Sequence, residues 1–329
     1  MGQPTGMERA GARLIHLMRR PIVWVPISSA LLFLVIVRAQ PWAVSPLVRA
    51  ADTRLIAAAI ALNIVVVSLW GLRSAALIRA ASLPIGLGSA TRLASMAYAV
   101  NSVTPGSTGE AVRAIVLREG HGIPYSVGLG AIMVERFGAL WYLGASAAWA
   151  WLTVELSLPL GALLAGWAMV AALPMVWSWT SLTTGGLVRF VARAMSEPRR
   201  EALRVGSRRL DDAIRLMLGR PGSALVFALT SAGLFGTFAA QLVLVAASVG
   251  VRLEPVAAWS AIGLAMVAGV LSLLPFGLGA TDVVMTAGLV RAGLDPAVAA
   301  ALTLAYRLVS TLPLGLLGAA AYWRTSSKH

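Results

Sequence analysis

The segment Asn101-Ser-Val-Thr-Pro-Gly-Ser-Thr-Gly-Glu-Ala-Val-Arg113 interrupts an apolar stretch that extends from about residue 84 to residue 120. Pro105 and Gly106 stand near its middle, and Gly109 follows. Proline removes a backbone donor and glycine loses the most conformational freedom in a helix, so a helix stops at such a site. We expect two half-helices that meet at this break and form a re-entrant hairpin, which dips into a membrane and returns.

A second apolar stretch, about 255–293, carries the interruption Pro275-Phe-Gly-Leu-Gly279. Pro275, Gly277 and Gly279 predict a break of the same kind in the middle of this stretch. We therefore expect a second re-entrant hairpin.

The two interrupted stretches match when one is shifted by 170–171 residues. Pro105 then falls on Pro275, and Arg136 falls on Arg307. Between these points both copies carry a half-helix, a glycine turn and a proline-led helix start, in the same order. This agreement predicts an inverted-topology repeat, which recurs in secondary transporters. Chance similarity between stretches rich in Gly, Ala and Leu is the alternative.

The composition of the whole chain is that of a membrane protein. Of its 329 residues, 58% are hydrophobic and 12% are charged, with a mean hydropathy of +0.81; an ordinary soluble protein has about 25% charged residues. A soluble enzyme, a disordered chain and a nucleic-acid-binding domain are therefore not expected, and an all-α polytopic membrane protein remains. The chain has no cysteine and three scattered histidines, so we expect no metal site.

The net charge of +14 comes mostly from arginines between apolar runs. Cytoplasmic loops of membrane proteins have this pattern, so we expect no nucleic-acid partner. Six runs are candidates to cross a bilayer as full transmembrane helices: 22–37, 55–72, 124–154, 157–179, 222–250 and 296–323.

The distribution of positive charge predicts the orientation of these spans. If both hairpins return to their own side, the inside segments hold 17 Lys and Arg and the outside segments hold 4. The inside segments are then 1–21, 73–83, 180–221 and 324–329. This bias favours six spans with the N-terminus and the C-terminus in the cytoplasm, and it assigns Arg73 to a cytoplasmic loop. If both stretches crossed fully, the loop 180–221 would face outside.

Residues 180–221 separate an N-terminal half, 1–179, from a C-terminal half, 222–329. The segment carries nine arginines and four acids, and Leu210 and Ile214 belong to an apolar pattern at helical spacing. Two interpretations stay open: an amphipathic helix on anionic inner-leaflet lipids, or a solvated linker.

Charged side chains inside a membrane are costly, so those that occur are candidates for function. Six lie within the two repeats: Glu110, Arg113, Glu135, Arg136, Asp282 and Arg307. In one interpretation, Glu110 and Asp282 cap their half-helices and pair with Arg136 and Arg307. In the other, the half-helix N-termini and the arginines hold an anion such as a lipid phosphate. The two interpretations are compatible.

Two uncharged residues complete the candidate site. Asn101 stands four residues before Pro105, and we expect its amide to bond to unpaired backbone at the break. Tyr306 stands beside Arg307 and is a candidate to bond a headgroup.

The segment Asn101–Arg113, followed by Glu135-Arg136, resembles the lysylphosphatidylglycerol synthase transmembrane, or flippase-like, family. That family's pattern reads roughly Asn, then Pro-Gly-x-x-Gly-Glu-x-x-Arg, then Glu-Arg. Its second signature, Pro-x-Gly-x-Gly-x-x-Glu with a later Arg, is similar to Pro275–Asp282 and Arg307. The resemblance spans almost the whole chain. It implies a multi-pass protein of the bacterial inner (cytoplasmic) membrane that flips or transports lipids.

The sequence departs from the family pattern at three points. Asp282 stands where the family usually has Glu, and Gly138 and Ala139 stand where an acidic residue often follows the Glu-Arg pair. The sequence ends at His329 without the soluble aminoacyl-transferase domain of the bifunctional lysyl-lipid synthases. From this we expect a stand-alone member that does not transfer an amino acid to lipid.

These features predict a lipid translocator rather than an enzyme, with a membrane lipid as substrate and with no catalytic residue and no cofactor. The chain has no Gly-x-x-x-x-Gly-Lys-Ser/Thr loop of an ATPase. The alternatives are an intramembrane lipid-modifying enzyme that uses Glu110 and Asp282 as a carboxylate pair, and a non-catalytic partner of an envelope biosynthesis enzyme. The lipid, the energy source and the oligomeric state stay open, a homo-oligomer included.

Overall fold

The computed structural model describes residues 49, 51–103, 108–179, 205, 208, 211–272 and 277–326, and these residues form helices and no strand. In chain order the helices are α4 (Thr53–Ala80), α5 (Leu87–Val103), α6 (Thr108–His121), α7 (Tyr125–Glu155), α8 (Leu160–Trp179), α11 (Pro221–Ser248), α12 (Pro255–Leu271), α13 (Ala280–Arg291), α14 (Pro296–Tyr306), a π turn (Arg307–Thr311) and α15 (Leu312–Ser326). The predicted span 22–37, most of the predicted linker 180–221, and Pro105, Gly106 and Pro275 lie outside the described residues.

Each interrupted stretch forms two separate helices, as the breaks predict. α5 and α6 occupy the first stretch, and α12 and α13 occupy the second. At the second break Gly277 and Gly279 have φ of +60° and +85°, which glycine adopts without the steric cost that a side chain brings.

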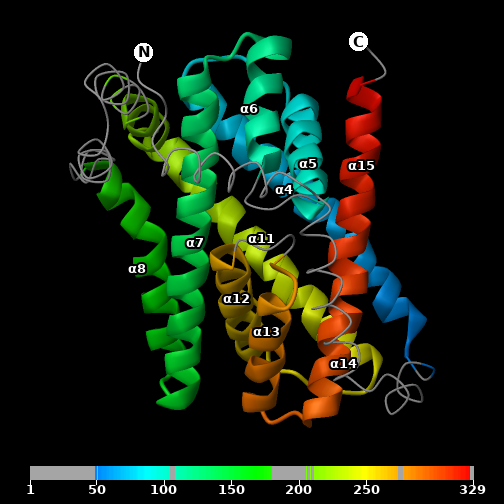
Figure 1. Ribbon diagram of the computed structural model, residues 1–329. Helices are drawn as coiled ribbons and strands as arrows, with labels where there is room; N and C mark the ends of the chain where they lie inside the picture. The colour runs from blue at the N-terminus through cyan, green and yellow to red at the C-terminus, as the bar shows by residue number, and fades with distance from the viewer. Residues whose placement is uncertain are drawn as a thin grey trace, which may run out of the picture.

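The helices α4 to α7 of the first half have counterparts in the same order in the second half, whereas α8 has none among the described residues. α4 and α11 each have 28 residues, and α5 and α12 each have 17. α7 has 31 residues, and α14, the π turn and α15 form a rod of the same length. Figure 1 shows α5 and α6 toward one end of the molecule and α12 and α13 toward the other, with α7 and the α14–α15 rod running in opposite directions.

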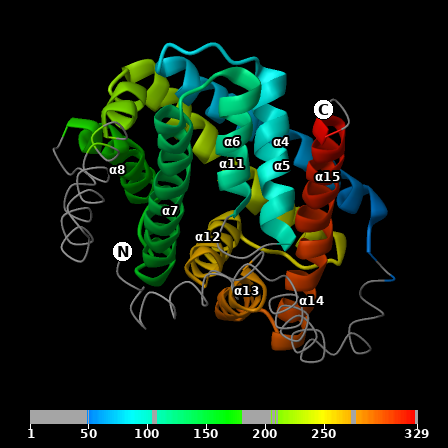
Figure 2. The same cartoon turned by 45° about the horizontal axis from the view of Figure 1, so that its top comes forward.

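An antiparallel pair, α4 and α11, joins the halves. The backbone N–H of Asp52 donates to the Ser248 carbonyl (2.8 Å) where α4 begins and α11 ends, and the Arg220 guanidinium donates to the Ser82 hydroxyl (3.2 Å) at the opposite end. Beside this pair, α5 packs on α15 and α12 packs on α7, as Figures 1 and 2 show. Each hairpin therefore packs on the long helix of the other half, so both halves line the space between the hairpins.

Glycine makes these exchanged contacts close. A Cβ atom on Gly318 of α15 would lie 2.2 Å from the Ser95 carbonyl oxygen of α5, and one on Gly263 of α12 would lie 2.4 Å from the Ala147 Cβ of α7. Small residues that let two helix backbones approach are the usual means of helix association in membranes.

The end of α4 differs from the prediction. The hydropathy pattern ends a span at residue 72 and assigns Arg73 to a cytoplasmic loop, but α4 continues to Ala80. Ser74, Leu77 and Ile78 are buried against the rest of the protein, so tertiary packing extends the helix beyond its apolar run. The loop assignment of Arg73 is wrong, because the residue lies inside the fold with 7% of its surface exposed.

The π turn Arg307–Thr311 interrupts the α14–α15 rod directly after Tyr306. Pro313 has no N–H, so the Val309 carbonyl lacks its usual donor four residues later. The side-chain amide of Asn63 on α4 donates to this carbonyl at 2.8 Å. The turn begins at a residue of the candidate site, and π turns are frequent at functional sites.

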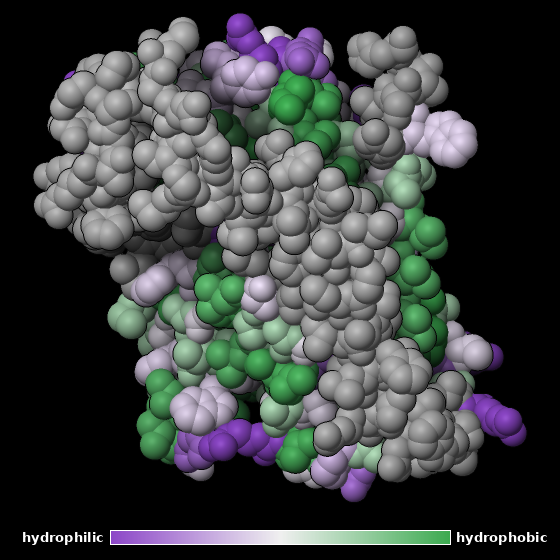
Figure 3. Space-filling view, viewed as in Figure 1, coloured by the Kyte–Doolittle hydropathy of each residue, from purple (hydrophilic) through white to green (hydrophobic). Residues whose placement is uncertain are grey.

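The described surface is that of a multi-pass membrane protein. Among the described residues, three helices are long and apolar enough to cross a membrane: Thr53–Ala80, Pro221–Ser248 and Pro296–Ala321. In the coloured part of Figure 3, hydrophobic residues cover the middle of the face and hydrophilic residues gather toward its two ends.

Candidate functional site

A cavity of about 310 Å³ lies between the two halves. Its volume falls at the lower end of the range of about 300–1,000 Å³ that is typical of small-molecule pockets. α4 to α7 line one part of it, and α11 to α15 line the rest. All eight predicted site residues line this one cavity: Asn101, Glu110, Arg113, Glu135, Arg136, Asp282, Tyr306 and Arg307.

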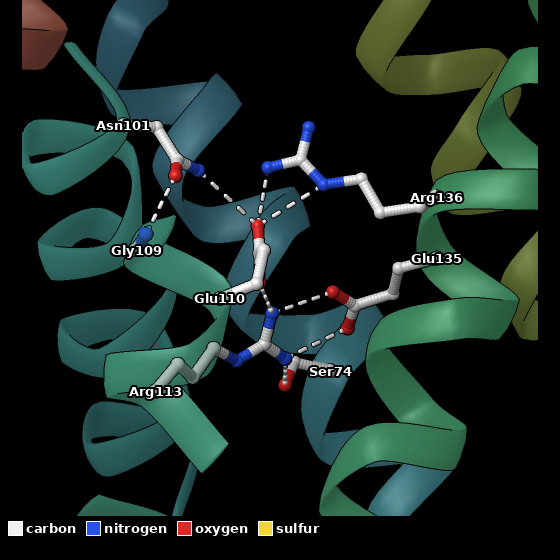
Figure 4. Close-up of polar contacts among 7 residues, drawn as sticks. All are labelled: Ser74, Asn101, Gly109, Glu110, Arg113, Glu135 and Arg136. Atoms are coloured by element: carbon white, nitrogen blue, oxygen red, sulfur yellow. Dashed lines mark hydrogen bonds and ion pairs between the residues drawn. The ribbon is translucent and has the colours of Figure 1, made fainter. Parts of the chain in front are cut away.

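Glu110 is at the centre of the polar contacts around the first break (Figure 4). Its Oε1 accepts hydrogen bonds from the Arg136 Nε at 3.1 Å, from the Arg136 Nη2, and from the Asn101 Nδ2 at 3.5 Å. The Asn101 Oδ1 accepts the backbone N–H of Gly109 at 2.7 Å, so its amide satisfies the start of α6. A Cβ atom on Gly109 would lie 2.1 Å from the Ala97 carbonyl oxygen, which shows how closely α5 and α6 approach here.

Arg113 is held deeper in the same cluster. It is 2% exposed, and its Nη1 and Nη2 donate to the two Glu135 carboxylate oxygens at 2.6 Å and 3.0 Å. Its Nη2 also donates to the Ser74 hydroxyl, and its Nη1 lies 3.5 Å from a Glu110 oxygen. This two-pronged contact fixes the Arg113 guanidinium against α7 and α4.

A smaller cluster stands at the second break. The Arg307 Nε donates to the Asp282 Oδ1, and its Nη2 donates to the Asp282 Oδ2 at 2.8 Å. The same Oδ2 accepts the backbone N–H of Gly279 at 2.9 Å, so Asp282 also satisfies the start of α13. Beside this pair the Tyr306 hydroxyl is buried and makes no hydrogen bond within the described residues.

The acid–arginine pairs occupy matching positions in the two halves. Glu110 lies as far from the start of α6 as Asp282 lies from the start of α13, and Arg136 and Arg307 lie equally far along their rods. Each pair thus ties the start of a half-helix to the next helix of the same half. Glu110 thus pairs with Arg136 and Asp282 with Arg307, as one of the two interpretations of the sequence expects. The binding of an anion at these arginines stays a prediction.

The other charged residues of the described cavity lining all belong to the first half. Three of its charged positions hold uncharged residues in the second: Arg73 corresponds to Gln241, Arg113 to Met285 and Glu135 to Tyr306. Most of the charged lining residues therefore come from α4, α6 and α7, whereas α11 and α12 contribute apolar residues such as Phe235 and Met266.

Arg73 is the charged residue of the described cavity lining that the sequence pattern does not predict. Its Nε and Nη1 are buried and have no hydrogen-bond partner among the described residues. Its guanidinium carbon lies 5.8 Å from the centre of the Phe227 ring. The sequence contains one signal that was available: Pro84 is the first helix-stopping residue after Gly71, which places the helix end well beyond Arg73.

The sequence profile described as "Lysylphosphatidylglycerol synthase TM region" matches residues 22–318, which include both halves and every residue of the cavity. The chain belongs to this family. Membership in the lysylphosphatidylglycerol synthase transmembrane family makes the chain an integral membrane protein linked to lipid handling. Comparisons with curated proteins and with solved structures give no significant match.

Proposed function

We propose that the protein moves a lipid with a polar, phosphate-bearing headgroup between the leaflets of a bacterial inner membrane by alternating access. The charged cavity between the halves carries the proposal, because each half contributes an acid–arginine pair to it. Membership in a lipid-handling family supports a lipid as the substrate. The headgroup occupies the cavity of about 310 Å³, and the hydrocarbon chains stay in the bilayer.

In the proposed layout six helices cross the membrane, both termini are cytoplasmic, and the two hairpins enter from opposite faces as an inverted-topology repeat. The placement of α5–α6 and α12–α13 at opposite ends in Figure 1 supports this layout. α7 has 31 residues, or about 46 Å at about 1.5 Å per residue, which exceeds a hydrocarbon core of about 30 Å. Transporters with inverted repeats bind their substrates near the membrane midplane.

A headgroup phosphate that enters the cavity meets arginines that already have carboxylate partners. Arg136 is the most accessible of these, with 40% of its side chain exposed, against 13% for Arg307 and 3% for Arg113. Arg136 can therefore exchange Glu110 for a phosphate oxygen at the least cost in desolvation. Because each hairpin packs on the other half, a rocking motion between the halves would open the cavity to one leaflet and close it to the other.

The direct test replaces one arginine of each pair. We expect the double variant Arg136→Ala, Arg307→Ala to lose transport of a fluorescent phospholipid in reconstituted vesicles, measured by quenching of the outer leaflet. The matched control is Arg252→Ala in the exposed loop between α11 and α12, which lies outside the cavity and should transport at the wild-type rate.

Two results would contradict the proposal. A folded double variant that transports at the wild-type rate would remove the arginines from the mechanism. A change in the mass of the lipid after incubation with the wild-type protein would favour the lipid-modifying alternative, because a translocator leaves its substrate chemically unchanged.

A further inference from the structure

The charges that line the cavity do not balance. Among the described lining residues, the charged ones are four arginines and three acids: Arg73, Arg113, Arg136, Arg307, Glu110, Glu135 and Asp282. Each of the three carboxylates accepts hydrogen bonds from an arginine, and three of the arginines are used in this way. The described lining therefore carries one net positive charge, and it belongs to Arg73.

Arg73 is more than nine-tenths buried and lines the cavity, and no acid of the described residues makes a hydrogen bond to it. Its contact with the Phe227 ring attracts the cation but offers no acceptor to the buried Nε and Nη1. A buried guanidinium that lacks acceptors is unfavourable. A ligand that brings negatively charged oxygens to Arg73 would remove this penalty.

The second half has no equivalent group. Gln241 stands at the corresponding position of α11, and its side-chain amide donates to the Ala59 carbonyl of α4 at 2.9 Å. Gln241 does not line the cavity. The unbalanced charge is therefore a feature of α4 alone and does not follow from the similarity of the two halves.

We propose that Arg73 binds the anionic group of the substrate, and that its single unbalanced charge selects a lipid whose headgroup carries one negative charge, a phosphodiester. This inference rests on the proposed lipid transport and names its substrate class. Arg73 thereby determines which headgroup is bound, whereas the arginines that have acid partners position the headgroup in the cavity.

The chemistry of phosphate supports a diester over the other common headgroups. A diester carries one negative charge at neutral pH, which balances the one net positive charge of the described lining. A phosphate monoester carries about −1.5 to −2 charges and would leave the same site negative. A zwitterionic headgroup would bring a cation next to a site that is already positive. The planar fork of an arginine also fits two oxygens of one phosphate group.

The test measures lipid binding to the purified protein in detergent by native mass spectrometry. The probes are dioctanoyl phosphatidylglycerol, with one negative charge, and zwitterionic dioctanoyl phosphatidylcholine. We expect the wild-type protein to prefer the first. Arg73→Gln should weaken the binding of phosphatidylglycerol about ten- to a hundredfold, which corresponds to the loss of a hydrogen bond to a charged group. The binding of phosphatidylcholine should not change.

Two further variants separate charge from folding. Arg73→Lys keeps the charge without the fork, so we expect it to keep the preference at reduced strength. Arg79→Gln on the same helix is the matched control, because the Arg79 guanidinium donates to the Ile85 carbonyl at 2.8 Å and lies outside the cavity. It should bind both lipids as the wild type does.

Either of two results with a folded variant overturns the inference. One is an Arg73→Gln protein that keeps the full preference for phosphatidylglycerol, and the other is an Arg73→Lys protein that has no such preference. Deacylated glycerophosphoglycerol is the third probe. If it binds as tightly as phosphatidylglycerol, the ligand is a soluble phosphodiester and the lipid assignment is wrong. If the wild type transports no lipid, the proposed function fails, but the binding comparison still decides the role of Arg73.

Discussion

Replacement of Glu135 by leucine is expected to lower the free energy of unfolding by about 3–5 kcal/mol, the usual cost of removing one partner of a buried ion pair. Glu135 is 7% exposed and accepts both prongs of the Arg113 guanidinium. Its loss would leave the buried Arg113 guanidinium without its main counter-charge, and unfolding in a denaturing-detergent titration measures the effect.

Removing both partners tests whether the cost comes from the unpaired charge or from the loss of the side chains themselves. The double variant Arg113→Met, Glu135→Leu should recover most of the lost stability, because apolar residues of similar size can replace a buried ion pair at little cost. The control is Glu155→Leu on the same helix, whose ion pair with Arg291 is at the surface with 40% and 59% of the two side chains exposed; such pairs contribute about 0–1 kcal/mol. A Glu135→Leu protein as stable as the wild type would show that this acid does not neutralise the cluster.

A cross-link between α7 and α13 is expected to abolish transport. The Glu155–Arg291 ion pair joins the end of the long helix of the first half to the end of the hairpin of the second. Alternating access requires these halves to move against each other. The chain has no cysteine, so Glu155→Cys with Arg291→Cys introduces one reactive pair, which a short, reducible bis-thiosulfonate reagent would join.

Transport of the cross-linked protein should return after reduction, since the reagent alters no cavity residue. Each single-cysteine variant treated with the same reagent is the control and should stay active. Undiminished transport by a fully cross-linked protein would mean that the halves do not rock, and alternating access between them would be wrong.

Local chemistry made the two breaks and most of the charged residues of the cavity predictable from the sequence. Proline and glycine close together, as in Pro105-Gly106 and Pro275-Phe-Gly277, interrupt a helix, and a charge such as Glu110 or Asp282 is conspicuous inside an apolar stretch. Arg73 is less conspicuous, because it directly follows the last residue of the apolar run; the late position of Pro84 indicates a longer helix, but only the packing of Leu77 and Ile78 shows that the residue is buried.

The contacts between helices that are distant in the sequence could not be predicted from it, for a different reason. The exchange of hairpins between halves depends on close contacts such as that of Gly318 with Ser95, and nothing local to either residue identifies the partner. The Val309 carbonyl in the π turn likewise accepts a hydrogen bond from Asn63, which lies on another helix. The placement of the cavity between the halves follows from these contacts.

The central claim is that two hairpins enter the membrane from opposite faces and meet at a shared charged cavity. Single cysteines in this cysteine-free chain test it at exposed positions: Gly86→Cys and His121→Cys at the two ends of the first hairpin, and Arg252→Cys and Ala292→Cys at the two ends of the second. The measurement is labelling by a membrane-impermeant maleimide in vesicles of known orientation. The account predicts that the first two label only from the cytoplasmic side and the last two only from the opposite side. Labelling of the two ends of either hairpin from different sides would contradict it.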